Sequence, residues 1–396
     1  MAPVITCKFF VETFFCKRHI LKSAFIYSPL FSQYDFGPLH PFKTARAKIV
    51  YELCHRYSLL DRPWIEIAKP EPLCFEKLSL FHNGDYLNLL KAASSNAFAF
   101  EMLGCGLGTE ENPVFEGLYD LITLSAGATY LGADLLVNQG FSVALNVFGG
   151  FHHAGTSHAE GFCYINDAGV AISHLLKEGL KVAYIDLDAH HGNGIQDAFY
   201  TDPRVLKISL HESGKTLYPW SGYETEIGKG GGKGYTVNLP LPQGTDDETY
   251  LSAFAQVVPP LITAFAPDIT LGVFGADTHR SDPLTHLNMS NYALCEAVKI
   301  IRGLSPKLLA LGGGGYNLYT SARTWSLLWA IMNKIEPDDT VMGAVGGMMY
   351  GPEAESGSLE QDSLVSTTGA AKEKIQKEVA GKVEYIKKTV FPLLGA

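Results

Sequence analysis

The chain has 396 residues, of which 46% are apolar and 18% charged, and it contains 40 glycines and 20 prolines. This composition excludes a disordered, collagen-like or coiled-coil chain, and the length is ample for a large buried core. The 31 basic and 41 acidic side chains leave a formal net charge of −10. Since no basic run is present, this charge argues against direct DNA or RNA binding and leaves room for a cationic ligand.

The first 23 residues are largely apolar but are interrupted by Lys8, Glu12, Lys17 and Arg18. No small-residue cleavage site follows, so a signal peptide is not expected, and we interpret residues 1–23 as an extension outside the core. The next predicted elements are a strand at 24–27, a helix at 44–57, helical pieces within 76–93 and a long helix at 113–138 that starts with a proline.

Beyond this helix, short apolar segments alternate regularly with amphipathic ones. Strands are predicted at 142–147, 181–187, 205–210, 268–274 and 307–311, and helices at 167–176, 247–265, 290–302 and 318–332. Because the strands are almost continuously apolar, the alternation implies a parallel sheet with helices on both faces. We therefore expect an α/β fold: one catalytic domain at 24–350 with three layers, α/β/α, around a mainly parallel central sheet.

The C-terminal part changes character. Residues 351–369 are rich in Gly, Ser and Glu, which is typical of a linker, and residues 370–396 are predicted to form a charged C-terminal helix that packs back on the domain.

The seven cysteines are scattered and form no Cys-x-x-Cys pair. Neither a disulfide scaffold nor a cysteine zinc site is expected, and a reducing compartment fits this usage better. No uninterrupted apolar run reaches the roughly 18 residues of a membrane-spanning helix. We therefore expect a cytoplasmic protein without a membrane partner.

Polar and glycine-rich motifs follow the predicted strands. They include GGFHHAG with His152 and His153, YIDLDAHHGNG with Asp186, Asp188, His190 and Asn193, FGADTH with Asp277, and LGGGGYN with Tyr316. In an open α/β sheet, ligands bind beyond the carboxyl ends of the strands. The five loops that follow the five regularly spaced strands, although far apart in the sequence, would meet along one such edge.

A metal site is predicted from Asp188, His190 and Asp277. Residues 186, 188 and 190 would point to one side of a strand end, and two buried carboxylates beside an imidazole require a cation. Three protein ligands with an open position are typical of a catalytic zinc site. The alternative is a buried Asp–His pair without metal; the convergence of the other loops favours the metal.

Two further groups have the residue types expected for acid–base catalysis and for stabilising an oxyanion. His152 and His153 follow two glycines at a strand end, and Asp186 is available to fix a histidine tautomer. Four glycines before Tyr316 would let its hydroxyl reach the site and donate to an oxyanion, although a packing tyrosine is the alternative. We predict that His158, His211, His279 and His286 are not ligands, and that residues 228–234 form a turn rather than a phosphate loop.

Taken together, these motifs resemble those of the zinc-dependent histone deacetylase superfamily, which has the arginase-like α/β fold. The similarity extends from about residue 25 to 334. The segments YSPLFSQYDFGPLHPFKTAR and GADTHRSDPLTHL most resemble the bacterial acetoin-utilisation-type deacetylases.

The resemblance assigns roles position by position. It implies that Asp188, His190 and Asp277 bind one zinc ion, that His152 and His153 are the catalytic pair with Asp186 orienting His152, and that Tyr316 stabilises the transition state. It places Gly161, Phe162 and Tyr218 on the walls of an acyl-lysine tunnel, Glu111 against the substrate backbone and Arg46 along an internal acetate channel.

The family also binds monovalent cations, usually potassium. The matching positions are Asp186, Asp188, His190, Ser209 and Leu210 for one site, and Phe199, Asp202, Val205 and Tyr235 for another. Three positions depart from the usual pattern: Asn193 replaces the aspartate that class I members pair with the second histidine, Tyr218 replaces a phenylalanine, and Glu111 is longer than the usual aspartate.

The resemblance therefore implies hydrolysis of acetyl-lysine in a protein substrate, linked to acetoin or acetate metabolism. Acetylpolyamine hydrolysis uses the same chemistry and is an alternative, as is a non-catalytic module that binds acyl-lysine. An arginase-like binuclear site would need an aspartate where this chain has Gly192.

Overall fold

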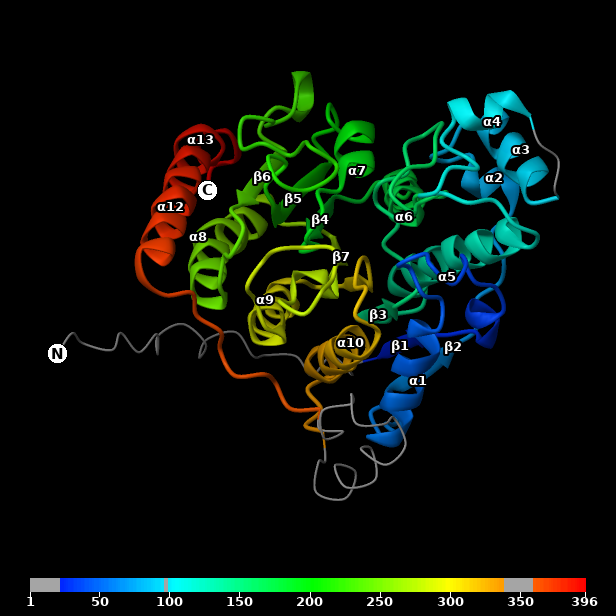
Figure 1. The fold of residues 1–396 in the computed structure, drawn as a ribbon, viewed down its shortest axis with the longest axis horizontal. Coiled ribbons are helices and arrows are strands. Elements are labelled where there is room, and N and C mark those ends of the chain that lie inside the picture. The colour runs from blue at the N-terminus through cyan, green and yellow to red at the C-terminus, as the bar shows by residue number, and fades with distance from the viewer. Residues whose placement is uncertain (1–21, 96–98, 338–358) are drawn as a thin grey trace.

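The computed structural model describes residues 22–95, 99–337 and 359–396. At its centre is a parallel sheet with the strand order β2-β1-β3-β8-β7-β4-β5-β6 (Figure 1). In chain order, the strands are β1 (Ser23–Ile26), β2 (Ile65–Ala68), β3 (Val143–Asn146), β4 (Val182–Asp186), β5 (Val205–Glu212), β6 (Thr236–Leu241), β7 (Ile269–Val273) and β8 (Leu308–Leu311).

Helices cover both faces of this sheet, as Figure 1 shows. One face carries α1 (Arg46–Arg56), α8 (Asp247–Phe265), α9 (Asn291–Leu304), α10 (Leu318–Asn333), α12 (Gly369–Thr389) and the short α13 (Phe391–Leu394). The other carries α2 (Phe75–Leu78), α3 (Gly84–Ala93), α4 (Phe100–Gly104), α5 (Leu118–Asn138), α6 (Asp167–Lys177) and α7 (Asn193–Ala198).

Side-chain alternation along the strands divides the core into two layers. Phe25 and Leu145 pack into one layer, whereas Ala24, Ile26 and Ala144 pack into the other. Both sides of the central strands are buried, which is why these strands read as continuous apolar runs. The predicted three-layer α/β/α fold with a parallel central sheet is confirmed.

Two strands were not predicted, β2 and β6, and both lie at the edges of the sheet. β2 has the sequence IEIA, in which the middle residues are exposed, and β6 contains Pro240. Proline is compatible with an edge strand, where its missing N–H faces no neighbour. The short α4 and α7 were not predicted either.

The predicted start of the long helix at Pro113 is wrong. The helix α5 begins at Leu118, after Gly117, whose φ is 84°. A β-carbon there would lie 2.2 Å from the ring of Tyr34, so the position requires glycine on two counts. The Pro113 carbonyl accepts a hydrogen bond from the Tyr164 hydroxyl at 2.6 Å, outside the helix.

By length and composition, α5 is apolar enough to cross a membrane, with a mean hydropathy of 1.2. Within the molecule, however, 72% of that window is buried. Its small residues allow close packing: a β-carbon on Gly127 would lie 1.9 Å from the Glu71 carbonyl oxygen. This helix is a core element.

The C-terminal helix α12 packs on α8 and β6 and contributes Ile375, Val379, Val383 and Ile386 to the core. The Lys382 ammonium donates to the Pro240 carbonyl on β6 at 2.8 Å, which satisfies a carbonyl of the edge strand.

The described chain before α12 is held to the body. Val365 N donates to Asp247 Oδ2 at 2.7 Å, and Thr367 N donates to Asp246 Oδ2 at 2.9 Å. Residues 1–21 of the predicted extension, 338–350 of the predicted domain and 351–358 of the predicted linker lie outside the described residues.

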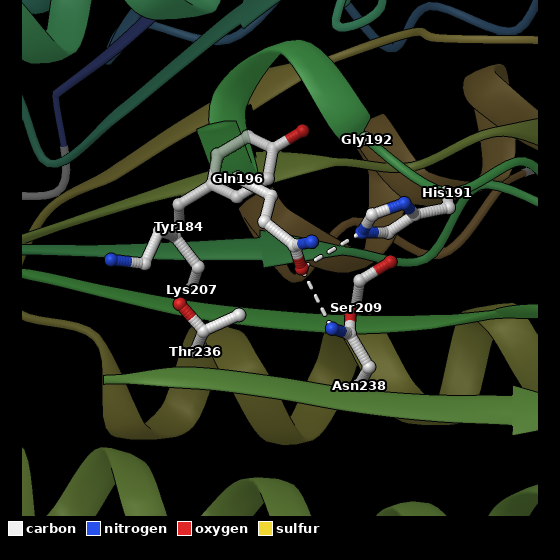
Figure 2. Close-up of a pocket in the computed structure, with 8 residues that line it drawn as sticks. All are labelled: Tyr184, His191, Gly192, Gln196, Lys207, Ser209, Thr236 and Asn238. Carbon is white, nitrogen blue, oxygen red and sulfur yellow. Dashed lines mark hydrogen bonds between the residues drawn. The ribbon is translucent and has the colours of Figure 1, made fainter. Parts of the chain in front are cut away.

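A small cavity of about 10 Å³ lies between α7 and strands β4 to β6 (Figure 2). That volume is about the size of one water molecule. The lining residues are Tyr184, His191, Gly192, Gln196, Lys207, Ser209, Thr236 and Asn238.

Candidate metal and acid–base site

The candidate site lies at the carboxyl edge of the sheet, where five loops meet. These loops follow β3, β8, β7, β4 and β5, which are consecutive neighbours in the sheet. Since all five strands are parallel, their carboxyl ends share one edge. The predicted convergence of the motifs is therefore confirmed by the strand order.

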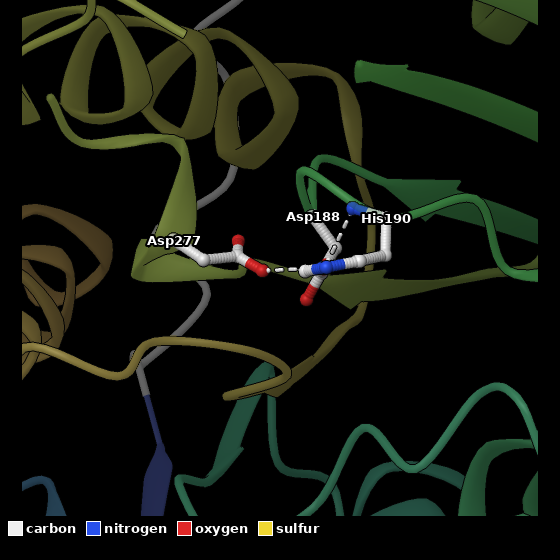
Figure 3. A group of neighbouring side chains, drawn as sticks. All are labelled: Asp188, His190 and Asp277. Carbon is white, nitrogen blue, oxygen red and sulfur yellow. Dashed lines mark hydrogen bonds and ion pairs between the residues drawn. The ribbon is translucent and has the colours of Figure 1, made fainter. Parts of the chain in front are cut away.

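The predicted metal ligands form one cluster. The ligand atoms of Asp188, His190 and Asp277 all lie within 4.8 Å of one another, and the three side chains are buried. His190 Nδ1 lies 2.9 Å from Asp277 Oδ2 and 3.2 Å from Asp188 Oδ1 (Figure 3). This donor set fits one divalent cation, because carboxylate oxygens and imidazole nitrogens are ligands that zinc takes and three protein ligands leave a position open, as in catalytic sites.

Main-chain hydrogen bonds fix the two carboxylates. Asp188 accepts from His190 N at 2.9 Å and from Gly314 N at 2.6 Å. Asp277 belongs to a 3-10 turn (Ala276–Thr278) and accepts from Ala189 N at 3.0 Å. The loops after β4, β7 and β8 are thereby joined at the ligands.

Glycines leave room for these carboxylates. A β-carbon on Gly275 would lie 2.4 Å from Asp188 Oδ2, and one on Gly314 would lie 2.2 Å from Asp277 Oδ2. Real β-carbons do not approach oxygen so closely, so a larger residue at either position would displace a ligand.

The charges in the cluster are strongly coupled. Burial alone would lower the pKa of His190, but the Asp188 and Asp277 carboxylates outweigh it and raise that pKa to about 10. Burial and the neighbouring Asp188 raise the pKa of Asp277 to about 8. Ionised carboxylates are costly to bury without a positive partner, and a bound cation would supply that charge.

The histidine pair lies beside this cluster. His152 Nδ1 donates to Asp186 Oδ2 at 2.7 Å, and the Tyr184 hydroxyl donates to the same oxygen at 2.5 Å. The Nε2 atoms of His152 and His153 lie 3.2 Å apart.

The two imidazoles differ in charge. Burial opposes protonation of His152, but the Asp186 and Asp188 carboxylates outweigh it and raise its pKa to about 9. For His153, burial and the positive His152 and His190 lower the pKa well below its usual value. The two pKa values are thus shifted in opposite directions, which favours a charged His152 beside a neutral His153, a division of roles that suits acid–base catalysis.

Asn193 orients the neutral imidazole. His153 Nδ1 donates to Asn193 Oδ1 at 2.8 Å, so His153 Nε2 carries the ring's lone pair, and this nitrogen faces His152 Nε2. The amide of Asn193 in turn donates from Nδ2 to Glu160 Oε2 at 3.2 Å.

Asn166 and Asp167, which sequence reasoning missed, hold the histidine loop in place. Asn166 Nδ2 donates to the carbonyls of His152 and Ala154, at 3.2 and 2.9 Å. Asp167 accepts from the main-chain N–H groups of Gly150 and Phe151. The Asn-Asp pair at the start of a predicted helix was the available signal, because such residues cap helices.

Tyr316 lies beside the metal-ligand cluster. Its ring centroid lies 6.2 Å from that of His190, and its N–H donates to Asp282 Oδ2 at 2.8 Å. Burial and the Asp277 and Asp188 carboxylates raise the pKa of Tyr316 far above its usual range, so the hydroxyl remains a donor.

The predicted tunnel residues lie beside Tyr316 and His153. The Phe162 ring meets the Tyr316 ring edge-on, with centroids 5.9 Å apart, and the Tyr218 ring lies 5.2 Å from that of His153. Gly161 has a φ of 54°, and a β-carbon there would lie 2.6 Å from the His153 ring. Phe162 and Tyr218 are half-buried, as wall residues would be.

Glu111 and Arg46 occupy opposite environments. The Glu111 side chain is exposed and its Oε2 accepts from Gly161 N at 3.4 Å, beside the wall. Arg46 is buried; it donates from Nη1 to the Gly313 carbonyl at 2.7 Å and stacks over Phe42. Its Nε finds no partner among the described residues.

The two predicted potassium sites differ. Asp186 and Ser209 are register partners across β4 and β5, and the other residues of that first set, Asp188, His190 and Leu210, are buried nearby. In the second set, Lys207 intervenes: its N–H donates to the Tyr235 carbonyl at 2.9 Å, and its Nζ donates to the Phe199 carbonyl at 2.5 Å. Asp202 and Val205 belong to the same turn, in which Val205 N donates to the Asp202 carbonyl at 3.4 Å.

The four histidines predicted not to be ligands are all outside the cluster. His279 contacts Ser281 and Asp362, and His286 contacts Glu212. His158 pairs with Glu160, and His211 lies between Ser209 and the Gly222 carbonyl.

Sequence comparison relates this chain to known proteins. Residues 40–332 match the model of the histone deacetylase domain. The acetoin utilization protein AcuC of Bacillus subtilis (strain 168) is 38% identical over 323 residues, which are 80% of this chain and 83% of that protein. The probable histone deacetylase 19 of Zea mays is 36% identical over 317 residues, covering 80% of this chain and 61% of the maize protein.

Solved structures agree with the sequence comparison. The chain superposes on the crystal structure of an HDAC homolog complexed with SAHA with a TM-score of 0.82 and 32% identity, covering 93% of this chain and 99% of the other. The structure of an HDAC homolog from Aquifex aeolicus gives a TM-score of 0.81 and 32% identity, with 92% and 100% covered.

Proposed function

The chain belongs to the histone deacetylase family and is a deacetylase, and from this premise we propose that it is a zinc-dependent enzyme that removes acetyl groups from lysine side chains of proteins. The observation that carries the proposal is the Asp188–His190–Asp277 cluster beside the His152–His153 pair, whose Nε2 atoms lie 3.2 Å apart. The relatives' names support a link to acetoin or acetate metabolism, and the bacterial relatives support a cytoplasmic location.

Asp188, His190 and Asp277 would hold the zinc ion. When bound, zinc supplies a Lewis acid that polarises the acyl carbonyl and makes a nearby water more acidic. Glycine backbone packed against both carboxylates keeps the ligands in place.

His153 serves as the general base in this proposal. It is neutral, and its Nδ1 is engaged with Asn193, so Nε2 takes the proton of the attacking water. The same Nε2 later returns a proton to the leaving lysine amine, so that the imidazole ends as it began. His152, charged and anchored on Asp186, stabilises negative charge that develops nearby.

Tyr316 serves as the oxyanion donor. Its hydroxyl stays protonated because burial and the surrounding carboxylates raise its pKa. A donor aimed at charge that develops only in the transition state accelerates the reaction rather than binding the substrate alone. Phe162 and Tyr218 would pack against the apolar stem of the substrate lysine.

An arginase-like binuclear site is disfavoured by the space around Gly192. A β-carbon at that position would lie 2.4 Å from Asp186 Oδ2 and 3.2 Å from His152 Nδ1. An aspartate there would displace the Asp186–His152 pair.

The test is an assay of the purified enzyme on acetyl-lysine peptides of increasing acyl length, with acetylspermidine in parallel. The proposal expects turnover of the peptides, loss of turnover after chelation and its return with zinc. Preferential hydrolysis of acetylspermidine would favour the polyamine alternative. Binding of SAHA without any hydrolysis, seen as a thermal shift, would favour the non-catalytic alternative.

A further inference from the structure

Lys207 is a buried lysine that the proposed chemistry does not use. It lies on β5, between its register partners Tyr184 on β4 and Thr236 on β6, and only 3% of it is exposed. Its Nζ donates to the Phe199 carbonyl at the end of α7, at 2.5 Å (Figure 2 shows its side chain beside the cavity). Lysine is rarely buried this deeply unless its amine has a defined partner.

The carbonyls around Lys207 are those of the second set of cation positions. Phe199 receives the Nζ of Lys207, and Tyr235 receives its main-chain N–H at 2.9 Å. Carbonyl oxygens are the ligands that a hard monovalent cation shares with an ammonium group, since both replace hydration by carbonyl dipoles. The amine therefore occupies the position beside the Phe199 carbonyl that a cation would take, whereas the Tyr235 carbonyl accepts an ordinary hydrogen bond between strands.

Nearby charge also disfavours an additional cation. The Arg204 guanidinium binds the Asp202 carboxylate through two contacts, at 2.6 and 3.0 Å, so that acidic side chain is already paired. Burial lowers the pKa of Lys207 to about 7, with Asp202 acting in the opposite direction. Whether charged or neutral, Nζ occupies the position beside the Phe199 carbonyl.

We propose that the Lys207 amine takes the place of the second monovalent cation in this chain. The backbone around Phe199, Asp202, Val205 and Tyr235 is then held by the amine of a side chain instead of an exchangeable ion. The residues of this second set accordingly do not fit a potassium ion, whereas the first set is unaffected. The stability of this part of the backbone should then not depend on the potassium concentration.

Thallium(I), a heavy substitute for potassium, tests this through anomalous diffraction of soaked crystals. In the wild-type protein we expect no peak at the Phe199 carbonyl, and in Lys207→Thr we expect a new peak there. Lys181→Thr is the matched control, because Lys181 also donates to a carbonyl, that of Phe265, at 2.5 Å, far from these residues in the chain. It should gain no peak.

A thallium peak at the Phe199 carbonyl in the wild-type protein would overturn the proposal, and so would the absence of a new peak in a folded Lys207→Thr. If that variant does not fold, Lys207→Val also removes the amine and shortens the side chain, so it opens the same position, and the wild-type result still decides. The readout needs no deacetylase activity, so failure of the proposed function would not affect it.

A second, independent observation concerns Glu160. Its Oε2 accepts from Asn193 Nδ2 at 3.2 Å and contacts His158 Nε2 at the same distance. A carboxylate can only accept hydrogen bonds, so it forces the NH₂ end of the Asn193 amide toward itself. The oxygen end must then face His153 Nδ1, at 2.8 Å.

This chain of contacts selects the tautomer of the base. With Asn193 Oδ1 facing it, His153 must carry its proton on Nδ1, which leaves Nε2 basic. We infer that Glu160 is a positioning residue that acts on His153 through Asn193, supplying the orientation that a directly paired aspartate would otherwise give.

Only the kinetic test of this inference, described below, rests on the proposed function; the NMR test does not. Nitrogen-15 NMR of the histidine rings reports the His153 tautomer directly: we expect the Nδ1–H form in the wild-type enzyme and in Glu160→Gln, whose amide oxygen can still accept. In Glu160→Leu we expect a mixture of tautomers. An unchanged tautomer in Glu160→Leu would overturn the inference whether or not the enzyme is active.

The kinetic arm uses a double-mutant cycle. Glu160→Leu should lower kcat by about tenfold with little change in KM, and should add nothing in an Asn193→Ala background, because Glu160 acts through that residue. His158→Gln, which removes an imidazole that also contacts Glu160, is the control and should leave kcat unchanged. Additive effects of Glu160→Leu and Asn193→Ala would contradict a role through Asn193.

Discussion

His190 Nδ1 lies 2.9 Å from Asp277 Oδ2, although 87 residues separate them in the chain. The two come together because β4 and β7 are neighbours in the sheet and both loops leave at the same edge. His279, only two residues from Asp277, instead contacts Asp362 at 3.2 Å. The strand ends, and not proximity in the chain, determine which side chains form the cluster.

Asp277→Ala should therefore abolish stoichiometric zinc binding, because removal of one carboxylate leaves two protein ligands for the ion. His279→Ala is the matched control and should retain the metal. Elemental analysis of the purified proteins measures both. Loss of zinc from His279→Ala together with its retention in Asp277→Ala would show that the ligand set is wrong.

Tyr316→Phe should lower kcat by about 10²- to 10³-fold, which is the usual effect of removing one oxyanion donor. KM and the zinc content should stay unchanged, since the ring remains in place beside Phe162. Steady-state kinetics on an acetyl-lysine peptide provide the measurement. Tyr319→Phe, at the exposed start of α10, should behave as wild type; full activity of Tyr316→Phe would refute the assigned role.

Asn193→Asp should move the acidic limb of the kcat/KM profile to higher pH. A general base must be neutral, and the pKa of His153 is lowered by burial and by the positive His152 and His190. A carboxylate next to Nδ1 raises that pKa, by roughly one unit or more, so the base becomes neutral only at higher pH. Asn138→Asp, at the exposed end of α5, should leave the profile where it is. A shift toward lower pH would contradict the assignment of His153 as the base.

Asp362→Asn should remove a pH-dependent part of the stability. Its hydrogen bond with His279 and the charge of Arg323 lower the pKa of Asp362 to about 2, against the opposing effect of burial. Because the pKa of Asp362 is lower in the folded state than its value of about 4 in the unfolded chain, the ionised group stabilises the protein at pH values above about 4. This contribution is lost as the pH falls from about 4 to 2.

After solvent screening, that contribution is on the order of 1 kcal/mol, because the carboxylate is only partly buried. Denaturant unfolding measured between pH 2 and 7 should show the difference between wild type and Asp362→Asn shrinking below pH 4. The exposed Asp61→Asn serves as the control. A difference that stays constant across the whole range would contradict the argument.

Ile386→Ala should lower the free energy of unfolding by about 2 to 5 kcal/mol, as expected for deletion of a buried aliphatic side chain. Ile386 is 0% exposed and belongs to the core shared by α12 and α8. Lys377→Ala, on the exposed side of the same helix, should change stability by less than about 0.5 kcal/mol. Equal and small effects of both substitutions would mean that α12 is only loosely attached.

The sequence predicted the site best where chemically active side chains directly follow buried strands. Strand ends carrying Asp188, His190 and Asp277 could be recognised because buried carboxylates are unusual, and the parallel sheet then placed them on one edge. Edge strands such as β2 could not be recognised, since their partly exposed residues lack the apolar run of a central strand. The start of α5 was misplaced because Pro113 is a common first helical residue, whereas the backbone turns at Gly117.

Supporting groups were harder to foresee. Asn166 and Asp167 look like ordinary helix caps in the sequence, and their hydrogen bonds to the histidine loop depend on the packing of α6 against it. Glu160 lies 33 residues before Asn193, and nothing in its immediate neighbours indicates that contact. The place of Lys207 beside the Phe199 carbonyl likewise depends on how α7 ends over β5.

The distances along the chain between site partners bear on how the protein folds. Asp186 meets His152 across 34 residues, and Gly314 meets Asp188 across 126. Contacts so remote in sequence form late, after the loops between them have closed. An unfolded chain has only the Asp188–His190 segment as a local chelator, so tight uptake of the metal should follow alignment of the central strands. The rate at which a refolding sample binds zinc would then report the rate of the last folding steps.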